Sequence, residues 1–155
     1  MIILGIDPGL ATTGYGIIKM ERSKIQPLDW GVIETKKNTP IEKRLEIIAD
    51  DLKKIIKKYR PQLAVVESVY FAKNVKTAII VSHARGVILL TLKKHKVKLQ
   101  ELTPLQMKSQ ITSYGAATKH QVQFMVGKML NLKTTPRPDD AADALALAIC
   151  GTIKK

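Results

Sequence analysis

The sequence contains little cysteine and little histidine. Cys150 is the only cysteine among the 155 residues, so the chain can form no internal disulfide and no C-x-x-C zinc site. The three histidines are scattered and give no pair of metal ligands at helical spacing. These absences exclude a disulfide scaffold and the common zinc motifs, and they favour a reducing environment.

Long hydrophobic runs and targeting signals are also missing. The apolar stretch over residues 86–92 is far shorter than the ~20 residues that cross a membrane. The apolar start, residues 1–6, is about one strand long and lacks the basic segment of a signal peptide. We therefore expect a cytoplasmic protein with no membrane association. The average composition, 45% hydrophobic and 25% charged, favours a single globular domain over residues 1–155.

Negative charge is scarce, and positive charge dominates. The 26 Lys and Arg residues against 13 Asp and Glu residues give a formal net charge of +13. A basic domain of this kind typically binds a polyanion, and nucleic acid is a better candidate than a membrane surface. The alternative that the lysines only form a soluble surface, as in heat-adapted proteins, stays open. Those proteins usually match lysine with glutamate, however, and this chain does not.

The spacing of apolar residues predicts strands in the first third of the chain. Residues 2–6, 14–19 and 25–34 read as three strands joined by short polar turns, which favours an antiparallel meander. An amphipathic helix over 41–59 then precedes a short buried strand over 63–67. Because a helix separates these strands, we expect a crossover connection and a parallel pair.

The second half is predicted to be mainly helical. A helix over 75–94, capped by Asn74, is apolar around much of its circumference, so it is either fully buried or paired with another subunit. A strand over 97–102 follows. Capping boxes begin at Thr39, Thr103 and Thr118, and Asp139 or Asp140 opens a last helix. Together these elements predict an α/β fold with a five-stranded mixed sheet, three strands antiparallel plus two parallel, flanked by helices.

Four acidic residues stand apart from those on helix faces. Asp7 ends the first predicted strand and Glu67 ends the fourth, each directly after an apolar run. Asp140 and Asp143 lie three residues apart at the start of the last helix and so share a face. If the two strands are adjacent and parallel, their acids emerge at the carboxyl edge of the sheet, where open α/β sheets place their sites.

Four converging carboxylates need protons or cations to neutralise them. Two like charges ~4 Å apart repel by about 4 kcal/mol at an effective dielectric near 20. Hard divalent cations prefer oxygen ligands, so the set favours Mg²⁺ or Mn²⁺. Two such ions suit phosphodiester cleavage, and with the basic surface they indicate a nuclease. Taken singly, Asp7 could be a turn former, Glu67 an ordinary strand-end charge, and Asp140 a helix cap.

Several short motifs occur in a fixed order from residue 2 to about 149. They are Gly5-Ile6-Asp7-Pro8-Gly9, Gly14-Tyr15-Gly16, Glu67 with Ala72-Lys73-Asn74, Ala84-Arg85-Gly86, Gln121-Val122-Gln123 and Asp140-Ala141-Ala142-Asp143-Ala144-Leu145-Ala146. This ordered set resembles the RuvC family, the Holliday-junction endonucleases of bacterial recombination. The resemblance implies a ribonuclease H-like fold, a homodimer, and Mg²⁺-dependent symmetric nicking of four-way DNA junctions. It also implies cooperation with the RuvA–RuvB branch-migration complex.

The same resemblance assigns roles to individual residues. The family's metal-binding and catalytic acids fall on Asp7, Glu67, Asp140 and Asp143, which would hold two Mg²⁺ ions, with Mn²⁺ as a substitute. Its DNA-contacting residues fall on Tyr70, Lys73, Lys108 and Lys119, of which Lys119 would lie nearest the scissile phosphate. Tyrosine replaces the phenylalanine expected at position 70, which leaves the cleavage preference open. The neighbouring Asp139 is interpreted as a helix cap, and the helix over 75–94 would form the dimer interface.

Other functions remain to be distinguished. One is an RNA-processing nuclease of the same fold, such as the pre-16S ribosomal RNA nuclease. Another is a non-catalytic junction-binding protein, although acids facing a phosphate backbone weaken binding unless metal lies between them. An actin-like or sugar-kinase ATPase also begins with a Gly-Ile-Asp turn, but it needs two such domains and 155 residues are too few.

Overall fold

A mixed β-sheet runs through the centre of the protein. The structure is a computed structural model that describes residues 1–22, 24–68 and 75–153. Within these ranges the sheet has the order β3-β2-β1-β4-β5. Antiparallel pairing joins β3 to β2 and β2 to β1, whereas β1–β4 and β4–β5 are parallel. The strands are β1 (Ile2–Asp7), β2 (Thr12–Glu21), β3 (Lys24–Glu34), β4 (Leu63–Glu67) and β5 (Lys98–Leu102). The predicted mixed sheet is therefore confirmed.

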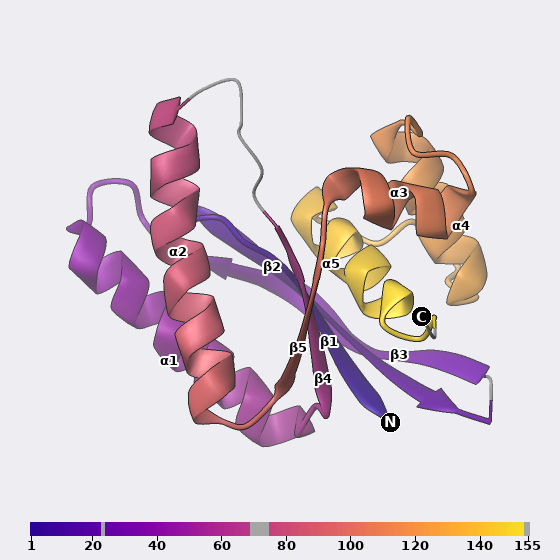
Figure 1. Cartoon of the computed structure of the whole chain (residues 1–155), viewed down its shortest axis with the longest axis horizontal. Coiled ribbons are helices and arrows are strands. Elements are labelled where there is room, and N and C mark those ends of the chain that lie inside the picture. The colour runs from indigo at the N-terminus through magenta and orange to yellow at the C-terminus, as the bar shows by residue number, and fades with distance from the viewer. Residues whose placement is uncertain (23, 69–74, 154–155) are drawn as a thin grey trace.

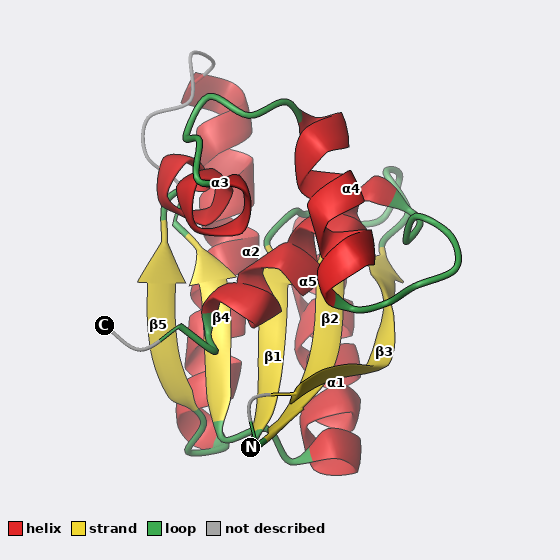
Figure 2. Cartoon of the chain, turned by 90° about the vertical axis from the view of Figure 1, so that its right-hand side faces the viewer, coloured by secondary structure: helices red, strands yellow, loops and turns green. Residues whose placement is uncertain are grey.

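Helices cover both faces of this sheet (Figures 1 and 2). One face packs against α1 (Ile41–Tyr59) and α2 (Val75–Lys94), and the other against α5 (Asp139–Cys150). Outside α5 lie α3 (Pro104–Thr112) and α4 (Lys119–Met129). Because successive strand residues point to opposite faces, Ile3 belongs to the α5 core and Leu4 to the α1–α2 core. Two apolar cores thus hold the sheet between two helical layers.

Glycines in β1 and β2 allow α5 to lie directly on the sheet. A Cβ at Gly5 would overlap the carbonyl oxygen of Ala144, and a Cβ at Gly14 would overlap that of Asp140. At Gly16 a Cβ would lie 2.7 Å from the backbone nitrogen of Leu145. Only glycine permits this close approach. The glycine motifs found in the sequence therefore set the position of α5.

The predicted helix starts are partly confirmed. Thr103 accepts a hydrogen bond from the Gln106 amide at 3.1 Å and its own amide donates to the Gln106 side chain, and Thr118 forms the same capping box. The box predicted at Thr39 is wrong. Pro40 occupies the N-cap of α1, because its carbonyl accepts the first helical hydrogen bond from Arg44, and no side chain caps the helix. The predicted cap at Asn74 lies outside the described residues.

The prediction that α2 is either fully buried or paired is decided in part. Its inward face is buried through residues such as Ala84 and Ile88. On the other side Ile79 is 54% exposed, Ile80 44% and Leu90 54%, so the single chain does not bury this helix.

Among the described residues no helix is both long enough and apolar enough to span a membrane.

Candidate active site

Asp7 and Glu67 lie side by side at the carboxyl edge of the sheet. Asp7 is the last residue of β1, and Glu67 is the last residue of β4. The two strands run parallel in a register that pairs Ile6 with Val66, so both acids follow directly from paired residues. Each side chain is half-buried. The predicted juxtaposition of the two strand-end acids is confirmed by the topology.

The first turns of α5 bring two further carboxylates to this edge. Asp140 stands beside β2, because its carbonyl oxygen lies over Gly14, the residue paired with Asp7. Asp143 lies one turn further along α5 and is the only residue of 141–150 that is not fully buried. Both aspartates act electrostatically on Asp7. The four acids singled out in the sequence therefore converge on one region.

Burial and mutual repulsion raise the pKa values of Asp7, Glu67 and Asp143. The pKa of Asp7 rises to about 8, first because the group is buried and then because Glu67, Asp143 and Asp140 surround it with negative charge. The pKa of Glu67 rises to about 6 through burial and the charge of Asp143. Burial also raises the pKa of Asp143. Without a cation Asp7 therefore retains its proton near neutral pH, as expected of a functional site rather than of a surface acid.

Two lysines from α3 and α4 face the acids. Lys119 Nζ lies 3.0 Å from Asp143 Oδ2, and the positive charge of Lys119 opposes the rise in the pKa of both Asp7 and Glu67. Lys108 on α3 likewise lowers the pKa of Glu67. The capping box at Thr118 fixes the start of α4 and thereby the position of Lys119. Both predicted lysines thus lie beside the acidic cluster.

Asp139 has a different environment from the predicted one. Pro138 is the N-cap of α5, and no side chain caps this helix, so the interpretation of Asp139 as a cap is wrong. One carboxylate oxygen of Asp139 instead accepts a hydrogen bond of 3.0 Å from Gln123 Nε2. The other lies 3.6 Å from Lys119 Nζ. Asp139 therefore links α5 to α4 and is a second carboxylate partner of Lys119.

The donor set suits a hard divalent cation. In this conformation no group of three or more His, Cys, Asp or Glu side chains within the described ranges is arranged closely enough to hold a metal ion. The carboxylates nevertheless lie near enough to raise the pKa of Asp7 to about 8, and Lys119 already neutralises Asp143. A divalent cation would replace the proton on Asp7 and this lysine as the source of positive charge. The chemistry of the site therefore fits a metal bound by oxygen ligands.

Comparison with known proteins identifies the family. The model of the crossover junction endodeoxyribonuclease RuvC family matches residues 3–151. This chain belongs to the RuvC family. The RuvC of Fusobacterium nucleatum is 50% identical over 149 residues, covering 96% of this chain and 78% of that protein. The RuvC of Thermosipho melanesiensis is 49% identical over 150 residues, covering 97% and 96%.

A solved RuvC structure has the same fold. RuvC of Thermus thermophilus in complex with a Holliday junction substrate superposes with a TM-score of 0.90 at 31% identity, covering 96% of this chain and 91% of that chain. The yeast mitochondrial Holliday junction resolvase Ydc2, at 16% identity and a TM-score of 0.63, shares the fold. The predicted family, the ribonuclease H-like fold and the enzyme class, an endodeoxyribonuclease, are thereby confirmed.

Two of the residues that the RuvC resemblance singled out cannot be located. Tyr70 and Lys73 lie outside the described residues, so their predicted contacts with DNA stay predictions. Asp7, Glu67, Asp140, Asp143, Lys108 and Lys119 are all described and lie at one edge of the sheet.

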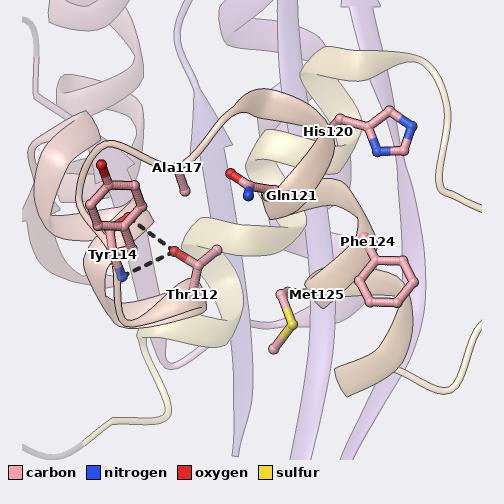
Figure 3. Close-up of a pocket in the computed structure, with 7 residues that line it drawn as sticks. All are labelled: Thr112, Tyr114, Ala117, His120, Gln121, Phe124 and Met125. Carbon is pink, nitrogen blue, oxygen red and sulfur yellow. Dashed lines mark hydrogen bonds between the residues drawn. The ribbon is translucent and has the colours of Figure 1, made fainter.

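Sequence reasoning missed a pocket between α3 and α4 of this RuvC-family chain. It has a volume of about 320 Å³, and Figure 3 shows Tyr114 and Phe124 at opposite ends of it. Tyr114 is 62% exposed and Phe124 55%. None of the four acids or the two lysines lines this pocket. The only signal in the sequence is an aromatic residue in α4 outside the buried stripe that includes Val122 and Val126.

Proposed function

We propose that this chain resolves Holliday junctions during recombination and DNA repair. It would nick two strands symmetrically and leave 5′-phosphate and 3′-hydroxyl ends that a ligase can seal. The observation that carries this proposal is the convergence of Asp7, Glu67, Asp140 and Asp143 at one sheet edge in a chain of the RuvC family, where burial raises the pKa of Asp7, Glu67 and Asp143. The relative from Thermus thermophilus, solved with a Holliday junction substrate, supports the choice of DNA substrate.

We further propose that the four acids hold two Mg²⁺ ions, for which Mn²⁺ can substitute. Bound there, a divalent cation supplies the Lewis acidity that activates water and stabilises the leaving 3′ oxygen in phosphodiester cleavage. Burial of Asp7 lowers the local dielectric and so strengthens the attraction between this carboxylate and a bound cation. The acids must then be ionised, because only carboxylates bind metal well.

The two lysines would act on the DNA. Once a cation neutralises Asp143, Lys119 is free to turn its ammonium group toward the scissile phosphate, where it offsets the charge of the transition state. Lys108, which faces Glu67 from α3, would bind a neighbouring phosphate and fix the strand. Tyr70 and Lys73 are proposed as further DNA contacts on the basis of the resemblance alone.

We propose a homodimer with α2 at its interface. Ile79, Ile80 and Leu90 lie exposed on α2, and a partner copy of the same helix would cover them. A two-fold axis would then relate two active sites, which suits the two equivalent strands of a four-way junction. The single domain over residues 1–155, the RuvA–RuvB partner and the cytoplasmic location stay predictions.

Cleavage of a panel of substrates tests the proposed function. Purified protein would be incubated with Mg²⁺ or Mn²⁺ and a four-way DNA junction, a linear duplex of the same sequence, or a structured ribosomal RNA precursor. We expect paired nicks in the junction alone. The variant D143N should be inactive, whereas D50N, which makes the same charge change at an exposed position of α1, should cleave normally.

The other outcomes separate the alternatives. Cleavage of the RNA precursor with an intact junction would indicate the RNA-processing nuclease. Junction binding without cleavage in either metal would indicate a non-catalytic junction-binding protein. Both results would contradict the proposed function.

A further inference from the structure

A second concentration of positive charge lies at the edge of the sheet opposite the carboxylates. Helices α1 and α2 pack against each other and both end at this edge (Figure 1). Six exposed cations gather on the two helix ends, in the turns that follow them and at the start of β5, and we call them the basic edge: Lys57, Arg60, Lys93, Lys94, Lys96 and Lys98. An open pocket of about 450 Å³, lined by Lys57, Arg60 and His95 among others, joins the two ends.

Acidic residues are missing from this part of the chain. No Asp or Glu occurs in residues 52–66 or 68–100. Among the described residues, none of the six cations of the basic edge forms an ion pair within 4 Å. Other lysines of α1 are paired: Lys43 with Glu46 at 2.8 Å and Lys54 with Asp51 at 2.7 Å. The basic edge therefore carries uncompensated charge.

Helix capping explains only part of this charge. Lys57, Lys93 and Lys94 lie in the last turns of their helices, where a cation complements the helix dipole. Arg60 and Lys96 lie beyond the regular turns with left-handed φ values of 51° and 59°, a conformation that favours glycine. Both turns thus carry a positively charged residue at a position where glycine would fit the backbone better. Helix capping does not explain the positive charge at these two positions.

We propose that the basic edge binds the phosphate backbone of a second double-stranded DNA segment. The five residues of β4 separate the basic edge from the carboxylates by about 17 Å at ~3.3 Å per residue, so one duplex contact does not cover both surfaces. Exposed lysines and an arginine without acidic partners fit a phosphate backbone, because its charges are regularly spaced and accept the same contacts at many positions. The proposal goes beyond junction cleavage and does not depend on it.

Protection of lysines from acetylation tests this contact directly. The full-length protein would be treated with an acetylating reagent in EDTA, with and without a 16-base-pair linear duplex, and modified lysines quantified by mass spectrometry. We expect the duplex to slow acetylation of Lys93, Lys94, Lys96 and Lys98 several-fold. Lys53, which is also exposed on α1, should react at the same rate in both samples. Equal reaction rates at the basic edge with and without duplex would overturn the proposal.

The salt dependence of duplex binding provides a second readout. The variant K93Q/K94Q/K96Q removes three cations, and K43Q/K53Q/K54Q makes the same charge change on the side of α1. Each lost phosphate contact lowers the slope of log K against log salt by about 0.9, so between 50 and 200 mM salt the wild type should lose about 40-fold more affinity than the first variant. The second variant should behave as the wild type. Equal slopes in the wild type and in K93Q/K94Q/K96Q would contradict the proposal.

A competitor distinguishes DNA from an acidic protein. Poly-glutamate at equal charge concentration should leave the basic-edge lysines protected by the duplex. If poly-glutamate displaces the duplex from these lysines, the surface prefers an acidic polypeptide and the assignment to DNA is wrong. Junction cleavage is measured separately with the same preparations, so a failure of the proposed function would not be mistaken for a failure of this one.

Discussion

Replacing Asp7 should change how the stability of the metal-free protein depends on pH. The pKa of Asp7 rises from 3.8 to about 8 on folding, so the folded state holds this proton more tightly than the unfolded chain. Such a group stabilises the fold at low pH and loses that contribution as the pH rises toward 8. The loss is about 1.4 kcal/mol per pH unit, or about 2.7 kcal/mol between pH 5 and pH 7.

The comparison of wild type with D7N isolates this contribution. Asparagine cannot ionise, so the melting temperature of the wild type relative to D7N, measured in EDTA, should fall by about 5 to 11 °C between pH 5 and pH 7. The variant D50N makes the same charge change at an exposed position of α1, away from the acidic cluster, and should not reproduce this pH-dependent difference. Addition of Mg²⁺ at pH 7 should raise the melting temperature of the wild type but not of D7N. A difference between wild type and D7N that does not vary with pH would refute the reasoning.

Three further predictions concern packing, positioning and assembly. Gly5→Ala should destabilise the protein by more than about 4 kcal/mol and abolish cleavage, because α5 is displaced; thermal unfolding and a junction assay test this. Asp139→Asn should lower kcat a few-fold with KM unchanged in a junction cleavage assay, because Lys119 loses its second carboxylate partner. A variant that is less stable but cleaves with the wild-type kcat would contradict this prediction. Leu90→Asp should give monomers in sedimentation with the fold intact, whereas Leu28→Asp, equally a surface change, should not.

The sequence predicted the strand-end acids well because their positions follow from local rules. An apolar run that ends in an acid fixes Asp7 and Glu67 at the end of a buried strand, and the intervening helix makes those strands parallel. The position of α5 was harder to derive, since it depends on contact between Gly5 and Ala144, which are far apart in the sequence. The resemblance to a family supplied that step.

The failures came from residues whose role depends on their neighbours in space. The Thr39 box was wrong because Pro40 itself takes the N-cap, a choice that the motif does not reveal. Asp139 was misread because its partners, Gln123 and Lys119, come from another helix. The pocket between Tyr114 and Phe124 likewise forms only when α3 and α4 pack together.

Cleavage of a synthetic mobile four-way junction tests the central claim most directly. Wild type and D7N would be assayed with Mg²⁺ and with EDTA, and the products treated with ligase. The account predicts paired nicks that a ligase seals, present for the wild type with Mg²⁺ and absent both in EDTA and for D7N. Cleavage by D7N at the wild-type rate, or by the wild type in EDTA, would contradict it.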